Sequence, residues 1–137
     1  MASWDIEFSH LKAGYGDNVV LTDVSGKLPG GAVSVILGGS GCGKSTLLRQ
    51  IIGLSHPMGG EIRIGGLNLL TMPGSDFRRM RRSMGVLFQD GAMLGALTLA
   101  ENVCLPLSEH LRLTKQELRT EAIRVLRMVG LGDFADY

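Results

Sequence analysis

Apolar and polar residues alternate at the start of the chain. Large apolar or aromatic side chains recur at every second position from Trp4 to Phe8, which is the period expected of a strand with one buried face. A second apolar run covers residues 19–24, and the intervening residues 13–18 are rich in turn formers. We therefore predict that residues 1–28 form an antiparallel β ribbon.

Further along, the pattern changes to short apolar runs and helical spacing. Residues 32–37 and 85–89 are apolar runs bounded by glycine, which is typical of strands buried on both faces. Apolar positions at helical spacing predict a helix over residues 44–54, directly after the first run. Residues 61–66 predict a strand and a turn, and residues 77–83 a short basic helix. This order favours an α/β fold.

Two helix starts are marked near the end of the chain. Thr98 is followed by Glu101, and Thr114 by Glu117, and each pair fits the capping box in which a hydroxyl and a carboxylate satisfy free amides. The second helix carries an apolar stripe opposite charged residues. Pro106 is predicted to kink or stop the first helix.

The strongest chemical signal lies between the predicted strand 32–37 and the helix after it. Residues 38–45 read Gly-Gly-Ser-Gly-Cys-Gly-Lys-Ser, which matches the phosphate-binding P-loop pattern. Its glycines let backbone N–H groups surround phosphates, Lys44 reaches the β and γ phosphates, and Ser45 offers a ligand for Mg²⁺. Cys42 is expected to be a small packing residue rather than a redox group. The predicted nucleotide-binding residues here are Gly38, Gly39, Ser40, Gly41, Cys42, Gly43, Lys44, Ser45 and Thr46.

Composition narrows the class of protein. The 137 residues are 45% hydrophobic and 20% charged, with a net charge of +1, which indicates one globular domain and gives no electrostatic case for nucleic-acid or membrane-surface binding. Two cysteines are too few for a disulfide framework and favour a reducing cytoplasm. With no signal peptide and no apolar run of about 18 residues, we expect a protein that stays inside the cell. A mean hydropathy of +0.19 suggests that partners cover some apolar surface.

Other polar clusters favour structural interpretations. Four arginines in residues 78–82 are expected to form a solvated face or a domain contact rather than a phosphate site. His10 and His110 have no ligand partners at metal-binding spacing, so no zinc site is predicted.

Beyond the P-loop, the chain resembles the ATP-binding subunits of ABC transporters over essentially its whole length. Tyr15, with Gly16 and residues 20–25, resembles the aromatic loop of that family, where the ring stacks on adenine; taken alone, it could be a simple turn tyrosine. Residues 55–62 resemble the turn after the P-loop helix. Gln89 stands where the family has its Q-loop glutamine, which binds Mg²⁺ and senses the γ phosphate.

The resemblance implies a P-loop NTPase core over residues 1–97 and the beginning of a helical subdomain over residues 98–137. It implies ATP and Mg²⁺ as cofactors, with Lys44 and Gln89 in catalysis and Ser45 and Gln89 as metal ligands. The expected partners are a transmembrane permease and a second ATPase subunit in a homodimer, with no nucleic acid. Membrane contact is then made only through the permease, at the cytoplasmic face of the inner membrane.

Residues 85–109 are most similar to one branch, the Mla/Mce-type phospholipid-trafficking ATPases. The sequence departs from that branch at Met93 and Leu94 and has Asp90 where serine is common, while Gly39 replaces the usual proline or alanine of the P-loop. The expected function is therefore ATP binding, and in a longer parent ATP hydrolysis, that drives phospholipid transport.

Several parts of an ABC ATPase are not found in the sequence. The signature motif, an apolar strand ending in Asp-Glu and a switch histidine are missing, so we expect a truncated chain that binds nucleotide without turnover. The alternatives are an ATPase of another ABC importer or exporter, and a soluble ABC protein acting on DNA or ribosomes, which should show coiled-coil or tandem insertions. A P-loop kinase or GTPase would need a lid or a base-reading Asn-Lys-x-Asp motif, and neither is found.

Overall fold

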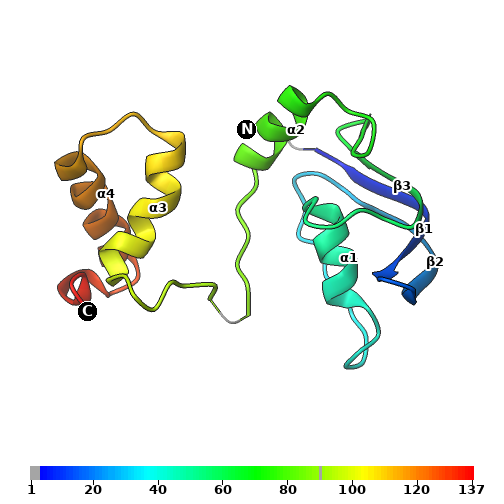
Figure 1. Ribbon diagram of the computed structural model, residues 1–137, viewed down its shortest axis with the longest axis horizontal. Helices are drawn as coiled ribbons and strands as arrows, with labels where there is room; N and C mark the ends of the chain where they lie inside the picture. The colour runs from blue at the N-terminus through cyan, green and yellow to red at the C-terminus, as the bar shows by residue number, and fades with distance from the viewer. Residues whose placement is uncertain (1–3, 90) are drawn as a thin grey trace. The chain divides into compact units, whose positions relative to one another are not determined.

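The computed structural model describes residues 4–89 and 91–137, so Asp90 lies outside the described residues. The chain forms two compact units, Met1–Met84 and Gly85–Tyr137 (Figure 1). The division of the sequence at residues 97 and 98 remains a proposal about the domains of the protein.

The first unit is built on an antiparallel sheet. Its strands are β1 (Ile6–Tyr15), β2 (Asn18–Leu28), β3 (Gly59–Ile64) and β4 (Leu67–Asn68), in the order β2-β1-β3-β4. β1 pairs with β2 in antiparallel fashion from Tyr15 opposite Asn18 to Ile6 opposite Leu28. The predicted β ribbon and the predicted strand after residue 60 are therefore both confirmed.

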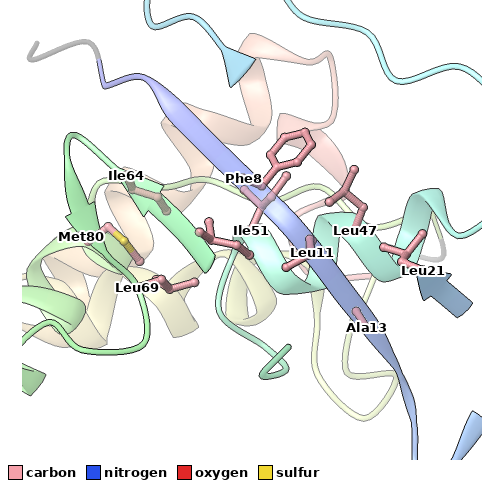
Figure 2. Close-up of a cluster of buried hydrophobic side chains, with 10 residues drawn as sticks. Phe8, Leu11, Ala13, Leu21, Leu47, Ile51, Ile64, Leu69 and Met80 are labelled. Carbon is pink, nitrogen blue, oxygen red and sulfur yellow. The ribbon is translucent and has the colours of Figure 1, made fainter. Parts of the chain in front are cut away.

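Two helices belong to this unit, α1 (Lys44–Ile51) and α2 (Gly74–Arg82). α1 packs against β1 and β2 because its apolar positions recur at helical spacing and form one buried face. The side chains meet in a single hydrophobic core (Figure 2). Its buried members are Phe8, Leu11, Ala13, Leu21, Leu47, Ile51, Ile62, Ile64, Leu69 and Met80.

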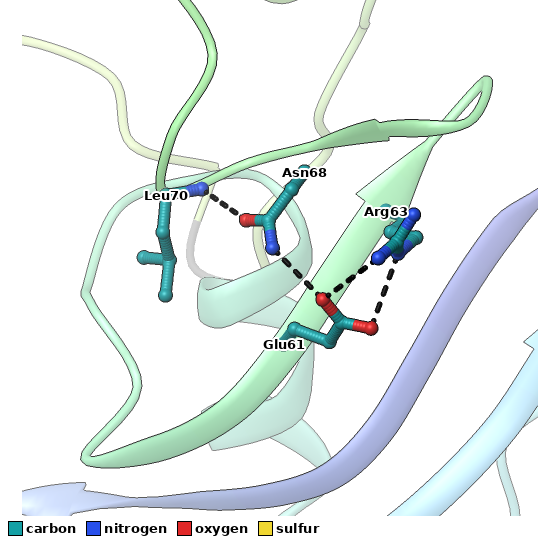
Figure 3. A network of polar contacts seen from close by, with 4 residues as sticks. All are labelled: Glu61, Arg63, Asn68 and Leu70. Carbon is teal, nitrogen blue, oxygen red and sulfur yellow. Dashed lines mark hydrogen bonds and ion pairs between the residues drawn. The ribbon is translucent and has the colours of Figure 1, made fainter.

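A polar network fixes the hairpin formed by β3 and β4 (Figure 3). The Glu61 carboxylate accepts hydrogen bonds from Arg63 Nε at 3.1 Å and from Asn68 Nδ2 at 2.9 Å. Asn68 Oδ1 in turn accepts from the backbone N–H of Leu70 at 2.9 Å. The Arg63 guanidinium lowers the pKa of Glu61. The carboxylate therefore stays ionised and keeps its hydrogen bonds to Arg63 and Asn68.

Residues 33–37 and 86–88 do not form the two buried strands that the sequence predicts. Neither segment has regular secondary structure, and Val33 and Leu87 are 95% and 91% exposed. A strand needs hydrogen bonds from a neighbouring strand, and among the described residues every strand of the sheet is paired elsewhere. An apolar β-branched run thus predicts the tendency to form a strand, but it does not supply the partner.

The second unit is helical. α3 (Leu99–His110) and α4 (Lys115–Met128) pack together with a short 3₁₀ turn, η1 (Gly132–Phe134). Both predicted capping boxes are formed: Thr98 Oγ1 accepts from the Glu101 N–H at 3.2 Å, and Thr114 Oγ1 from the Glu117 N–H at 3.3 Å. The buried residues of this unit are Ala100, Ala122, Leu126 and Ala135.

Pro106 does not stop the first of these helices, because α3 continues through it to His110. A proline inside a helix removes one hydrogen bond, and packing against a second helix offsets that loss. Within residues 4–89 and 91–137, no helix combines the length and the apolar character needed to cross a membrane.

Candidate functional site

The P-loop is a glycine-rich turn that leads directly into α1. Gly41 and Gly43 have φ angles of 79° and 96°, in the left-handed region that side chains with a Cβ rarely adopt. Gly43 also packs closely: a Cβ there would lie 2.5 Å from Leu21 Cδ2 and 3.1 Å from Val20 Cγ1. The start of β2 and the start of α1 therefore meet at a position that only glycine fits.

The N-terminus of α1 has no side-chain cap. Gly43 is the N-cap residue, the first turn contains no acidic residue, and the first helical hydrogen bond runs from the Leu47 N–H to Gly43 O at 2.9 Å. Both helices of the second unit, in contrast, use a threonine and a glutamate at this place. The backbone N–H groups of the first turn of α1 are thus free to bind an anion, with the helix dipole adding partial positive charge.

Lys44 folds back over the loop. Its Nζ donates hydrogen bonds to the carbonyl oxygens of Gly38 and Gly39, at 2.7 and 2.6 Å, and lies 3.6 Å from Cys42 Sγ. The exposed thiol of Cys42 is free, and Ser45 is exposed in the first turn of α1. A cation, a hydroxyl and free amides therefore gather within eight consecutive residues.

Tyr15 lies against the same helix. Its Oη is 3.4 Å from Thr46 Oγ1, and Arg49 Nη1 is 3.4 Å from the same oxygen. The Arg49 guanidinium carbon is 6.0 Å from the centre of the ring, within cation–π range. The Thr46 hydroxyl, and then Arg49, lower the pKa of Tyr15. Since Tyr15 is 48% exposed, its ring can still offer a face to a ligand.

Sequence reasoning did not predict the contacts of Thr46 and Arg49 with this ring. One signal was available: the two residues are three apart on the predicted helix, so they share a face. That the face meets Tyr15 depends on the packing of α1 against β1, which the pattern alone does not give.

These residues fit a nucleoside triphosphate with Mg²⁺. A phosphate chain suits the uncapped amides and the glycine turn, where a Cβ would fill the space. The hydroxyl of Ser45 is the kind of oxygen ligand that Mg²⁺ takes alongside phosphates and water. Among the described residues, no group of three His, Cys, Asp or Glu residues could hold a metal ion by itself, and a triphosphate would supply the missing oxygen ligands.

Gln89 belongs to the second unit, where it is an exposed turn residue after segment 86–88, which has no regular secondary structure. Its role as a metal ligand with Ser45 therefore stays a prediction. His10, in the first unit, makes an exposed contact of 3.0 Å between Nδ1 and Asp23 Oδ1.

Comparison with known proteins identifies the family. Residues 21–137 match the model of the ABC transporter family. The chain belongs to this family. The resemblance to the ABC transporter family is thereby confirmed, while the roles of Tyr15 and Gln89 stay predictions.

Curated relatives include a probable ribonucleotide transport ATP-binding protein of Mycobacterium leprae (strain TN), 39% identical over 127 residues, or 93% of this chain and 37% of that protein. A methionine import ATP-binding protein of Cereibacter sphaeroides (strain ATCC 17023) is 37% identical over 96% of this chain and 37% of its own length. This ABC transporter chain therefore spans little more than a third of the relatives that it matches.

Solved structures agree on the fold. A bacterial ABC transporter cassette solved as a dimer is similar with a TM-score of 0.82 and 30% identity, over 96% of this chain and 60% of that one. A dimeric cassette in a post-hydrolysis state bound to ADP and phosphate gives a TM-score of 0.75 and 26% identity with the same coverage. The α/β P-loop fold expected from the sequence is confirmed.

Proposed function

We propose that this ABC transporter chain binds ATP together with Mg²⁺ at the P-loop. The observation that carries the proposal is the uncapped N-terminus of α1, with Lys44 folded over the loop before it and Tyr15 placed against its first turn. Phosphate chemistry, a cation and an aromatic surface for a base occur there together.

Each residue has a defined task in this proposal. The backbone amides of residues 39–45 bind the phosphate oxygens, and Lys44 contacts the β and γ phosphates. Ser45 holds Mg²⁺, with Gln89 as a second ligand that senses the γ phosphate. Tyr15 stacks on adenine. When bound, Mg²⁺ neutralises phosphate charge that the protein would otherwise have to balance alone.

We further propose that the whole protein hydrolyses ATP as a homodimer and drives a transmembrane permease at the cytoplasmic face of the inner membrane. The dimeric cassettes that this chain resembles support the assembly. The 137 residues are proposed to bind nucleotide without turnover, because they lack a glutamate after a second apolar strand to position the attacking water.

The proposed cargo is phospholipid, on the pattern of residues 85–109. The relatives are named for ribonucleotide and methionine transport, so an ATPase of another ABC importer is the second candidate. Transport of labelled phospholipid, ribonucleotide and methionine by the whole transporter in proteoliposomes distinguishes them. Uptake of methionine or ribonucleotide without lipid movement would contradict the phospholipid proposal.

Calorimetric titration of the 137-residue chain with ATP and Mg²⁺ tests nucleotide binding. We expect saturable binding to the wild-type chain and a loss of about tenfold or more for Lys44→Ala, since the ammonium is the point charge on the phosphates. Lys115→Ala is the matched control, because Lys115 is an exposed lysine at the start of a capped helix. Equal affinities for all three chains would contradict the P-loop assignment.

A further inference from the structure

Tyr15 stands at the tip of the hairpin that β1 and β2 form. It is the last residue of β1 and pairs with Asn18 across a two-residue turn, and residues 15–19 are all exposed. A side chain at an exposed hairpin tip samples several rotamers, and a ligand that uses it has to fix one of them. The groups that hold this ring therefore affect how well it can bind a base.

Two side chains of α1 contact the ring of Tyr15. Thr46 is 5% exposed, and its Oγ1 lies 3.4 Å from Tyr15 Oη. Arg49, three residues further along the helix, places Nη1 3.4 Å from the same oxygen and its guanidinium carbon over the ring, 6.0 Å from the centre. The hairpin tip is thus joined to the helix that begins at the P-loop.

Arg49 is an exposed arginine whose side chain contacts Tyr15 rather than a carboxylate. Among the described residues, no carboxylate oxygen lies within 4.0 Å of its guanidinium. Its position in the last turn of α1 is favourable for a cation, because the helix dipole is negative at that end. The aromatic ring therefore takes the place that an ion pair has for other exposed arginines of this chain.

The ring of a tyrosine has two faces, and Arg49 lies over one of them. A cation and a base both interact with the π face of an aromatic ring. With one face covered by the guanidinium, a base that stacks on Tyr15 takes the other. Arg49 and the base then bind the ring at the same time and do not compete.

We propose that Arg49 is a positioning residue for nucleotide binding, which holds the ring of Tyr15 against α1 so that its other face is presented to the base. This inference rests on the proposed function, because it takes Tyr15 as the residue that stacks on the base. It assigns no contact between Arg49 and the nucleotide. Removal of Arg49 then weakens binding only through the ring.

A direct attraction between the arginine and the phosphates makes a different prediction. Such an attraction acts on any polyphosphate, and salt screens it. Positioning of the ring acts only on a ligand that carries a base. Affinities for ATP and for tripolyphosphate, measured at about 0.15 M salt where the Debye length is about 8 Å, therefore separate the two effects.

Calorimetric titration of the 137-residue chain with these two ligands, each with Mg²⁺, tests the proposal. We expect Arg49→Gln to lower ATP affinity about three- to tenfold, as for an unfixed side chain that binding has to order, and to leave tripolyphosphate affinity unchanged. Arg49→Lys keeps the charge without the planar group and should lie between. Arg112→Gln, which changes an exposed arginine of the other unit, is the matched control.

A double-mutant cycle shows whether Arg49 acts through the ring. In a Tyr15→Ala background, Arg49→Gln should cause no further loss of ATP affinity, because the group that it positions is absent. A role of Arg49 in the stability of α1 alone would lower affinity equally in both backgrounds. Retained binding of tripolyphosphate shows that the P-loop of each variant is folded.

The contact itself can be measured without nucleotide. Arg49, after Thr46, lowers the pKa of Tyr15, so Arg49→Gln should raise that pKa in an absorbance titration of the phenolate in a Tyr137→Phe background. An unchanged titration curve would overturn the proposal, because the ring would then not be held by Arg49.

Other outcomes separate this inference from the proposed function. If the wild-type chain binds ATP and Arg49→Gln binds it equally well, or loses ATP and tripolyphosphate affinity alike, the positioning role is wrong and the nucleotide site stands. Tighter ATP binding by Arg49→Gln would also overturn the inference, since the arginine and the base would then compete for one face. If no chain binds ATP or tripolyphosphate, the proposed function itself is wrong.

Discussion

The side-chain nitrogen of Lys44 lies 2.7 Å from the carbonyl oxygen of Gly38, six residues earlier in the chain. This hydrogen bond joins the first residue of α1 to the first residue of the P-loop. Carbonyl oxygens are weaker partners for an ammonium than phosphate oxygens, which carry full charge. The loop is thus arranged so that a phosphate chain can exchange for the carbonyl contacts of the lysine.

The close packing of Gly43 makes this loop sensitive to a single methyl group. We expect Gly43→Ala to lower the free energy of unfolding by about 1–3 kcal/mol, because its φ of 96° and the approach of Leu21 both oppose a Cβ. Thermal and denaturant unfolding, followed by circular dichroism, measure the loss. ATP affinity should fall in parallel as the loop shifts.

Gly39→Ala is the matched control for this change. Gly39 has no positive φ, and a Cβ there would meet nothing within 4 Å. We expect its unfolding midpoint to stay close to that of the wild type. If both alanine variants were equally stable, close packing at Gly43 would not explain the glycine.

The ring of Tyr15 should contribute to nucleotide affinity through stacking. Tyr15→Ala is expected to cost about 1–3 kcal/mol of ATP binding, while Tyr15→Phe keeps the stacking surface and is tolerated. Titration with tripolyphosphate is the control, since a ligand without a base should bind all three chains alike. An equal loss of ATP affinity in Tyr15→Phe would point to the hydroxyl instead of the ring face.

The hydroxyl of Tyr15 should titrate differently when its partner is removed. Thr46 is the main cause of the lowered pKa of Tyr15, so Thr46→Val is expected to raise that pKa toward the ordinary value of 10.0. Absorbance of the phenolate during alkaline titration, in a Tyr137→Phe background that leaves one tyrosine, gives the value. An unchanged curve would mean that the contact between Tyr15 and Thr46 does not form in solution.

Sequence patterns predicted most elements of both units because their signals are local. The Thr98 and Thr114 capping boxes name the helix starts directly, and the alternation from Trp4 to Phe8 identifies the first strand. The strands predicted at residues 33–37 and 86–88 are not formed, because their formation depends on contacts that are not local. A buried strand depends on distant neighbours, and the apolar runs carry no information about whether those neighbours are present.

The candidate site likewise contains residues that a local motif identifies and contacts that depend on packing between distant residues. The P-loop residues are consecutive, so the motif gives their identity and the turn gives their geometry. The contacts of Tyr15 with Thr46 and Arg49 join residues more than thirty positions apart. They result from packing of α1 on β1, and no local pattern encodes that packing.

Acid should destabilise the first unit through Asp5. Its carboxylate accepts a hydrogen bond from the Gly30 N–H at 2.8 Å and pairs with Lys27 Nζ at 2.6 Å. The bond from Gly30, followed by Lys27, lowers the pKa of Asp5 below its ordinary value of 3.8. A lowered pKa in the folded state contributes stability above pH 3.8 and loses it as pH falls through the folded value.

We therefore expect Asp5→Asn to be less stable than wild type at neutral pH and to lose less stability on acidification below pH 3.8. Thermal midpoints measured from pH 7 to pH 2 should converge at the acidic end, because both chains then lack the charge. Curves that stay parallel over the whole range would show that the Asp5 contacts do not contribute to stability.

The unpaired segment 33–37 should cause self-association. Val33, Val35 and Leu37 are exposed and recur at every second position, so in an extended conformation they would share one face. The strand edge formed there would have no neighbouring strand among the described residues. Such an edge is a template for pairing with the same segment of a second copy. Sedimentation velocity should show dimers or larger species that increase with protein concentration.

Val35→Lys should shift the distribution toward monomer, because a charge on the pairing face opposes association. Val129→Lys is the control: Val129 is also exposed, but it is the C-cap residue of helix α4 in the other unit. Monomeric wild-type protein at high concentration, or an equal effect of both lysine variants, would contradict strand pairing through residues 33–37.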